Sequence, residues 1–265
     1  VIQNSPAKKS GLIEGDFLLQ VDDKPVGDLT SSEVVNLIKG PKDSYVKLQI
    51  KRSNRVMNFT LQRATISVPA IDSQLIEQKI LYVRINKFTP NLKSLIDSVL
   101  SQVPDGQTQG YILDLRSNPG GYVESAVDVA DVFLPAKKEI LSLNYRQLQQ
   151  KRLTLYNNAR DIKPMYILIN RGTASASEIL AASLQEHFNA KLIGEQSFGK
   201  GTFQELKYFQ NSSALKLTIG QWLAPNGIAL DEVGLTPDIY VKTTLNDIQS
   251  GNDPVLNKAL QLLGL

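Results

Sequence analysis

A serine and a lysine are the residues of this chain that could act together in catalysis. Ser175 lies in the stretch GTASASE (172–178), and Lys200 lies in the glycine-bounded stretch GEQSFGKG (194–201). A serine hydroxyl becomes a nucleophile when a base removes its proton, and a lysine amine can be that base. The lysine must then be neutral, a form that apolar surroundings favour. Gln204, four positions after Lys200, would accept a hydrogen bond from the amine and fix its direction without adding charge.

The sequence also offers main-chain donors for the oxygen of a reacting carbonyl. The apolar spacing after Ser175 predicts a helix over 175–188, and the first N–H groups of a helix have no partner within it. These free N–H groups and the helix dipole favour negative charge, as an oxyanion hole requires. The N–H of Ala176 is one candidate donor. Gly120 and Gly121, in the turn NPGG (118–121), could supply a second, although such a turn can also be an ordinary strand-to-helix connection.

Other interpretations of the same residues stay open at this stage. Ser175 could be only a helix cap, with Glu178 completing a capping box. Lys200 taken alone is typical of a solvated surface lysine. Ser177 lies two positions from Ser175 in a similar setting and is its rival as nucleophile. The single histidine, His187, lies more than three turns along the predicted helix from Ser175, so it cannot reach the hydroxyl and we expect a structural role.

One stretch resembles a nucleotide-binding motif but lacks its last residue. The stretch from Gly194 to Lys200 matches a phosphate-binding loop up to its last position, where Gly201 replaces the serine or threonine that binds magnesium. The residues after Gly201 indicate a strand rather than the helix that such a loop requires. We therefore expect no nucleotide to bind here.

Composition narrows the class of protein. The 265 residues are 42% hydrophobic, which is ordinary for a soluble globular chain, and a net charge of +3 is too small to favour nucleic acid as a partner. With no cysteine, disulfides, thiolate catalysis and zinc–thiolate sites are excluded, and one histidine argues against a histidine-based metal centre. No apolar run approaches the ~20 residues of a membrane span.

Two regions are expected along the chain. Residues 1–63 contain a turn-rich stretch over 11–16, a strand over 17–21, a short helix capped by Thr30 or Ser31, and two strands over 46–50 and 56–61. Residues 64–265 alternate strands with helices, which favours an α/β fold with βαβ crossovers. The strands are expected at 80–85, 110–115, 166–170 and 191–194, and the helices at 92–103, 123–133, 175–188 and 255–263. The polar stretch 141–163 is expected to be an irregular excursion over the site.

The first region resembles a PDZ domain. The resemblance rests on SPAKKSGLIEGD (5–16), VDDKPV (21–26), the following helix and KGP (39–41). PDZ domains are small α+β barrels that bind peptides by adding a strand to a sheet edge. They usually place one or two strands and the carboxylate-binding loop before the point where this chain begins. The resemblance therefore implies a truncated PDZ domain over residues 1–63 that lacks half of its peptide groove. The alternative is a remnant that serves only for packing.

The whole chain resembles the carboxyl-terminal processing proteases, PDZ-containing serine peptidases related to the tail-specific proteases. The motifs that carry this resemblance are DLRSNPGG (114–121), SASEI (175–179), GEQSFGKGTFQ (194–204), GLTPD (234–238) and DPVL (253–256). The family implies a crotonase-like α/β core over residues 64–265. It implies Ser175 as nucleophile, Lys200 as general base and Gln204 as the residue that orients the lysine. Ala176 and the Gly120–Gly121 turn would supply the oxyanion donors.

The resemblance also implies partners and a location. Substrates would be proteins or peptides with exposed C-termini, and no metal, cofactor, nucleotide or nucleic acid is expected. Members act outside the cytoplasm, in the periplasm, the cell envelope or the thylakoid lumen. Association with a membrane through a missing N-terminal segment, and assembly into a homo-oligomer, are further expectations. Two other classes stay open, namely a non-catalytic peptide-binding protein and an acyl-CoA enzyme of the same crotonase-like fold.

Overall fold

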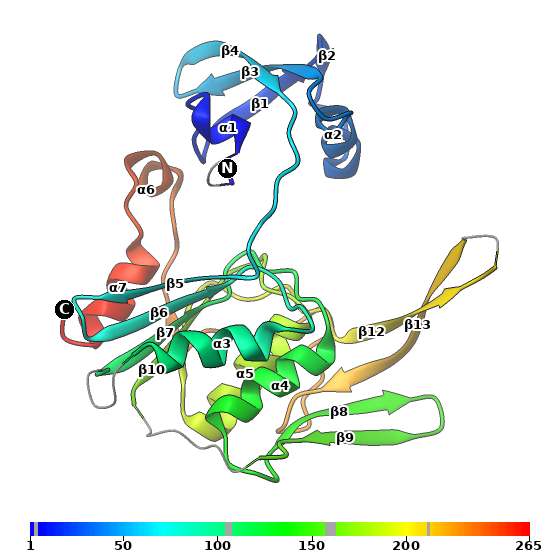
Figure 1. The fold of residues 1–265 in the computed structure, drawn as a ribbon, viewed down its shortest axis with the longest axis vertical. Coiled ribbons are helices and arrows are strands. Elements are labelled where there is room, and N and C mark those ends of the chain that lie inside the picture. Colours follow the sequence, from blue (N-terminus) through cyan, green and yellow to red (C-terminus); the bar gives the residue numbers. More distant parts are fainter. Residues whose placement is uncertain (3–4, 104–107, 157–162, 211–212) are drawn as a thin grey trace. The chain divides into compact units, whose positions relative to one another are not determined.

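The computed structural model describes residues 1–2, 5–103, 108–156, 163–210 and 213–265. The chain forms two units, which are treated separately (Figure 1). The first contains Val1–Val68 together with Thr243–Asp253, and the second contains Pro69–Lys242 together with Pro254–Leu265. The sequence prediction placed one boundary after residue 63. It did not anticipate that a later segment returns to the first unit.

The first unit is built on a four-stranded antiparallel sheet with the order β2-β1-β3-β4. Its strands are β1 (Phe17–Val21), β2 (Lys24–Pro25), β3 (Tyr45–Arg52) and β4 (Arg55–Gln62), and its helices are α1 (Pro6–Lys9), α2 (Ser31–Ile38) and α6 (Leu245–Ser250). The alternation expected over 46–50 is confirmed, because Val46, Leu48 and Ile50 are buried and their neighbours on β3 are more exposed. Together with Leu12, Val21 and Leu61 they form the core of this unit.

Local contacts explain the helix boundaries of the first unit. Thr30 caps α2, since its Oγ1 accepts the N–H of Glu33 while the Glu33 carboxylate accepts the N–H of Thr30. Ser5 caps α1, since its Oγ accepts the N–H of Lys8 at 3.2 Å, with Pro6 as the first residue of the helix. The sequence pattern had indicated only turns near this segment. Helix α6 belongs to this unit because the side chains of Leu245 and Ile248 lie against Gly15.

The second unit contains a six-stranded sheet with the order β14-β11-β10-β7-β6-β5. All neighbouring strands are parallel except β5, which pairs antiparallel with β6. The strands are β5 (Ile71–Ile76), β6 (Ile80–Ile85), β7 (Gly110–Asp114), β10 (Met165–Ile169), β11 (Lys191–Gly194) and β14 (Ile239–Tyr240). The predicted strands 80–85, 110–115, 166–170 and 191–194 are therefore confirmed to within a residue, and the α/β class with them.

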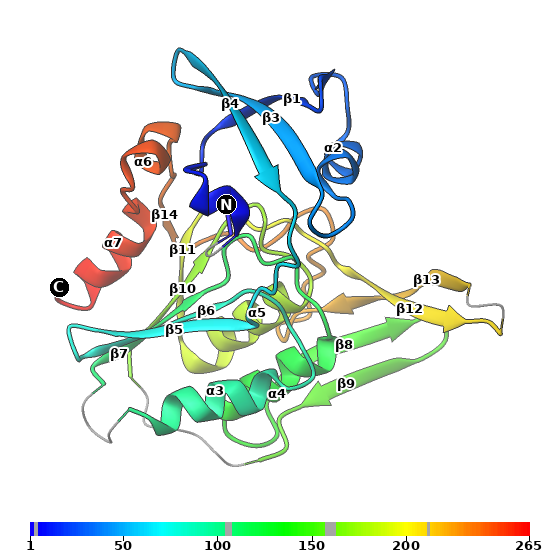
Figure 2. The same cartoon turned by 45° about the horizontal axis from the view of Figure 1, so that its top comes forward.

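Helices cover both faces of this sheet. Helices α3 (Leu92–Ser101), α4 (Val123–Phe133) and α5 (Ala176–Phe188) pack on one face, and α7 (Pro254–Leu262) packs on the other (Figures 1 and 2). Successive residues of one strand serve opposite faces, so Leu113 contacts the larger core while Ile112 contacts the side of α7. Burial on both faces accounts for the continuous apolar runs in the sequence.

A second, antiparallel sheet has the order β12-β13-β8-β9. Its strands are β8 (Glu139–Tyr145), β9 (Gln149–Leu153), β12 (Thr202–Tyr208) and β13 (Ala214–Leu223). The predicted irregular excursion over 141–163 is therefore wrong for its described part, which forms the β8–β9 hairpin. The reason is that residues 140–143 are buried on both sides of the strand, so no polar–apolar alternation marks it. Residues 157–162 of that prediction lie outside the described residues.

Candidate active site

Ser175 lies at the turn between strand β10 and helix α5, in an unusual backbone conformation. Its φ of 59° and ψ of −121° are rare for a residue with a side chain. Such strain persists only where the surrounding structure enforces it, and it is frequent at functional sites. A serine on a sharp strand-to-helix turn is also how several hydrolases present their nucleophile.

Glycine is required where the NPGG turn meets this serine. A Cβ atom added to Gly120 would lie 3.0 Å from Cβ of Ser175 and 2.9 Å from the main-chain nitrogen of Ala176. A Cβ atom on Gly121 would collide with the carbonyl oxygen of Phe88. Both glycines also have positive φ, 95° and 152°. The predicted proximity of the glycine turn and the serine turn is therefore present in the structure.

Hydrogen bonding distinguishes the three candidate oxyanion donors. The N–H of Gly120 donates to Oδ1 of Asn118 at 2.8 Å, so it is already used within the turn. Among the described residues, neither the N–H of Gly121 nor that of Ala176 has a hydrogen-bond acceptor. Asn118 is itself buried and fixed, because its Nδ2 donates to the carbonyl of Ile85 at 2.6 Å. Gly121 and Ala176 are thus the two available donors of the predicted set.

Lys200 is half-buried and lies just before strand β12. Its main chain is held on both sides: the N–H donates to Oε2 of Glu178 at 3.0 Å, and the carbonyl accepts Nε1–H of Trp222 at 2.8 Å. Gln204 lies on β12 with an exposed side chain, and its Nε2 donates to Oγ1 of Thr218 at 3.4 Å. Lys200 and Gln204 therefore share the neighbourhood that was predicted, while the expected bond from the lysine amine to Gln204 stays a prediction.

Glu178 connects the serine and lysine segments. Its carboxylate is fully buried at 0% exposure and accepts four hydrogen bonds. Oε2 accepts the N–H groups of Ser175 at 2.8 Å and Lys200 at 3.0 Å, and Oε1 accepts Oγ–H of Ser197 at 2.6 Å and N–H of Gly199 at 2.7 Å. The sequence indicated Glu178 only as part of a possible capping box. Its position at the third residue of a helix was the available signal, but nothing local indicated the contacts with 197–200.

A second buried network lies at the carboxyl end of β7, just before the glycine turn. The Asp114 carboxylate is fully buried, forms an ion pair with Arg116 at 2.6 Å, and accepts the hydroxyl of Tyr82 at 2.7 Å. Burial raises the pKa of Tyr82 well above its ordinary value, and the negative charge of Asp114 adds to this effect. Tyr82 therefore stays a protonated donor, and the segment that leads to Asn118 is anchored at its start.

Five of the six predicted site residues line one cleft of about 890 Å³, namely Gly120, Gly121, Ser175, Lys200 and Gln204. The sixth, Ala176, is fully buried and is not part of the cleft lining. The charged residues at its border are Lys87, Glu124, Arg152, Glu205 and Lys216 in addition to Lys200. Within the described residues, no three histidine, cysteine, aspartate or glutamate side chains form a group suited to a metal ion.

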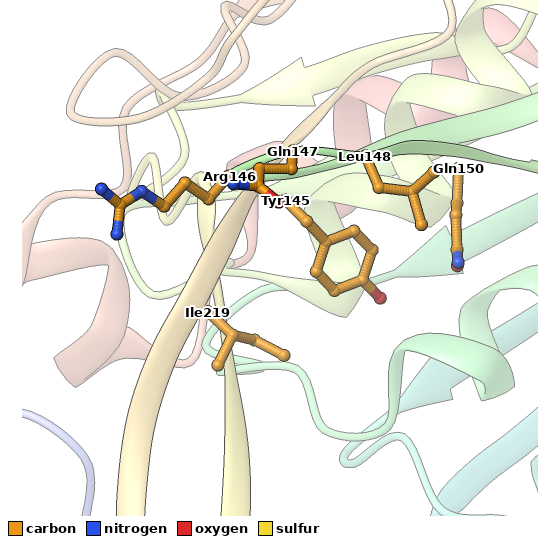
Figure 3. Close-up of a pocket in the computed structure, with 6 residues that line it drawn as sticks. All are labelled: Tyr145, Arg146, Gln147, Leu148, Gln150 and Ile219. Carbon is orange, nitrogen blue, oxygen red and sulfur yellow. The ribbon is translucent and has the colours of Figure 1, made fainter.

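An aromatic pair lines this cleft, and one of its rings also borders a neighbouring hollow. The rings of Tyr145 and Phe203 meet edge to face at 5.1 Å, and both line the cleft. Tyr145 and Ile219 also border the neighbouring hollow of about 660 Å³, where Leu148 and Arg146 lie on either side of them (Figure 3). The cleft therefore has an apolar wall on the side of β8 and β13.

The rival residues lie away from the cleft wall. Ser177 is fully buried, and its Oγ–H donates to the carbonyl of Asn118 at 3.1 Å. His187 bonds through Nε2 to the carbonyl of Glu139 at 2.7 Å. The segment after Gly201 forms strand β12, as predicted, rather than the helix of a phosphate-binding loop. Of the two serines, only Ser175 borders the cleft.

Two protein-family models match this chain. The model of peptidase family S41 matches residues 79–241, which include every candidate residue of the cleft. The chain belongs to peptidase family S41. The model of the PDZ domain matches residues 1–52 of this S41 chain. The family recognised from the motifs is therefore confirmed.

The relatives of this S41 chain have informative names. It is 36% identical to the carboxy-terminal-processing protease of Bartonella bacilliformis, over 97% of the chain and 61% of the relative. It is also 36% identical to the carboxy-terminal processing protease CtpA of Bacillus subtilis, over 90% of the chain and 51% of the relative. The solved photosystem II D1 C-terminal processing protease is similar at 25% identity and a TM-score of 0.69, over 89% of the chain and 66% of that protein. The chain thus spans between 51% and 66% of the length of these relatives.

Proposed function

We propose that this chain is a serine endopeptidase that cleaves protein substrates near their C-termini through Ser175 and Lys200. The observation that carries the proposal is the strained turn that presents Ser175 to a cleft shared with Lys200. Membership of family S41 and the names of the relatives support the same activity. The core would belong to the crotonase-like class, which agrees with a sheet covered by helices on both faces.

The proposed reaction uses groups that lie around the cleft. The neutral amine of Lys200 takes the proton of the Ser175 hydroxyl as its Oγ attacks the scissile carbonyl carbon. The N–H groups of Gly121 and Ala176 donate to the oxyanion of the tetrahedral intermediate. The protonated Lys200 then gives its proton to the departing amine, which leaves an acyl-enzyme on Ser175. Lys200 next activates a water that hydrolyses the ester, and Gln204 orients the amine through both steps.

Recognition and location complete the proposal. The unit that begins with residues 1–63 would bind the C-terminus of a substrate in the manner of PDZ domains, which add a peptide strand to a sheet edge. The protein would act outside the cytoplasm, as the resemblance to processing proteases implies. None of the helices in the described residues combines the length and the hydrophobicity that crossing a bilayer requires.

Cleavage of an unstructured protein with an apolar C-terminus tests the proposal. We expect Ser175→Ala and Lys200→Ala to lower the rate by about 10³-fold or more, because each removes one half of the nucleophile–base pair. Ser177→Ala is the matched control and should retain most of the activity, since its hydroxyl serves only a buried main-chain bond. Normal cleavage by Lys200→Ala would exclude the lysine as base. Loss of activity in Ser177→Ala but not in Ser175→Ala would show that Ser177, and not Ser175, is the nucleophile.

A further inference from the structure

The hairpin of β12 and β13 exposes large apolar side chains without an evident structural reason. Figures 1 and 2 show it projecting from the core unit beyond the helices. On β12, Leu206 is 50% exposed and Tyr208 is 74% exposed, and on β13 Leu215 and Leu217 are also exposed. A group of exposed apolar side chains on a soluble domain commonly marks a binding surface.

The strand register separates these side chains into two faces. Leu206 pairs with Lys216 and Tyr208 with Ala214, so both lie on the face that also carries Gln204. Leu215 and Leu217 pair with the intervening residues of β12 and lie on the opposite face. The border of the cleft includes Gln204, Leu206, Tyr208 and Lys216 of this face, and from the opposite face of this part of the hairpin it includes Glu205 but neither Leu215 nor Leu217. One face of the hairpin is thus continuous with the wall that holds Ser175 and Lys200.

Strand β12 also offers main-chain groups. It is the first strand of its sheet, and within the described residues it pairs only with β13. Every second residue of such an edge therefore directs its N–H and C=O away from the sheet, where an extended chain can pair with them. Residues 202–206 of β12 border the cleft in an unbroken run, which places this edge along it. A peptide bound to it would direct alternate side chains toward one face.

We propose that Leu206 and Tyr208 form an apolar subsite that binds side chains two positions apart in an extended polypeptide substrate. The spacing of Leu206 and Tyr208 fits such a substrate, because residues two positions apart lie about 7 Å apart both on β12 and on an extended peptide. Continuity of this face with the cleft identifies the occupant as the substrate chain on one side of the bond that Ser175 cleaves. The proposal rests on the protease function and adds that specificity extends away from the scissile bond.

Binding to the Ser175→Ala chain tests the subsite independently of catalysis. Two labelled peptides are compared by fluorescence anisotropy, one containing Leu-Ser-Leu and one with serine at all three positions. Both have an amidated C-terminus, which removes the carboxylate that a PDZ groove would bind. We expect the leucine peptide to bind about 10-fold more tightly, and Leu206→Ala or Tyr208→Ala to remove most of that preference.

Leu217→Ala is the matched control on the opposite face of the same hairpin, with a similar exposure of 44%. It should keep the preference for the leucine peptide. Equal loss in Leu206→Ala and Leu217→Ala, or an unchanged preference in Leu206→Ala, would overturn the subsite. A dimer that dissociates in Leu206→Ala, measured by light scattering, would assign the face to a second copy and also overturn it. Failure of the protease function would appear separately, as absence of cleavage of the unstructured protein with an apolar C-terminus by the unmodified chain.

Discussion

Replacing Glu178 by glutamine should uncouple the serine and lysine segments. The substitution keeps the size of the side chain but turns one of its two oxygens into an NH₂ group. Each oxygen accepts two hydrogen bonds. An NH₂ group in place of Oε2 would face the N–H groups of Ser175 and Lys200, and in place of Oε1 it would face the N–H of Gly199, whereas the Ser197 hydroxyl can accept as well as donate. At least one N–H therefore loses its acceptor, in a position with 0% exposure where water cannot replace it.

The size of the effect follows from the lost acceptors. A buried donor that loses its acceptor costs about 1–3 kcal/mol, so the loss is about 1–3 kcal/mol with the NH₂ group at Oε1 and about 2–6 kcal/mol with it at Oε2. About 2 kcal/mol, the middle of the smaller range, corresponds to a melting temperature lowered by roughly 4–8 °C for a domain of this size. If Oε2 is the lost acceptor, the affected donors are the N–H groups of Ser175 and Lys200 themselves. We therefore expect cleavage to fall by about 10²-fold or more even where the chain is still folded, because small displacements of catalytic groups are costly.

The assay combines thermal unfolding with cleavage measured well below the melting temperature. Glu77→Gln, an exposed glutamate in the turn between β5 and β6, makes the same chemical change and should alter neither quantity. If Glu178→Gln melted and cleaved like Glu77→Gln, the carboxylate would not hold the two segments, and this account of the site would be refuted.

Two further predictions concern the glycine turn and the first unit. Gly120→Ala should abolish cleavage in a folded chain, because its Cβ would press on Ser175. Gly227→Ala has a similar φ of 79° but lies in open space, so it should only lower the free energy of unfolding by the backbone strain of about 1–3 kcal/mol. Cleavage and unfolding are measured for both variants, and equal activity of the two would refute the contact. The hydrogen bonds of Arg52 hold the pKa of Asp16 below its ordinary value of 3.8, so this pair stabilises the first unit fully above that pH and loses its effect as the pH falls through the lowered pKa. The free energy of unfolding should therefore fall between about pH 7 and about pH 3, and this fall should be smaller in Asp16→Asn than in the unmodified chain. An identical fall in both chains would contradict the stabilising role of the Asp16–Arg52 pair.

The sequence predicted most of the core sheet because its parallel strands are short apolar runs between helices of clear periodicity. Strand β6 and strand β11 were placed at their observed bounds for that reason. The β8–β9 hairpin was missed because Ile140–Leu143 is buried on both sides and β9 is polar, so neither strand shows a simple alternation. Strand β13 was not anticipated either, since its outer residues are exposed on both faces.

Part of the candidate site could be predicted from local motifs, and the rest depends on contacts between segments that are distant in sequence. The serine turn, the lysine loop and the glycine turn are local motifs, and the structure brings all three to one cleft. The discrimination between Gly120 and Gly121 depends on a bond to Asn118, and that between Ser175 and Ser177 depends on which hydroxyl is buried. The contacts of Glu178 with Ser197 and Gly199 join segments that only the tertiary fold places together, so no sequence pattern of one chain could reveal them.

The return of residues 243–253 to the first unit gives the protein three covalent crossings between its units, after Val68, Lys242 and Asp253. The first unit is therefore not a removable tail on the second. Cutting the chain after Val68 would leave α6 tethered at both ends without the partner against which Leu245 and Ile248 pack. A cut at that point therefore removes most of the first unit but not all of it, and leaves behind a segment whose packing partner is gone.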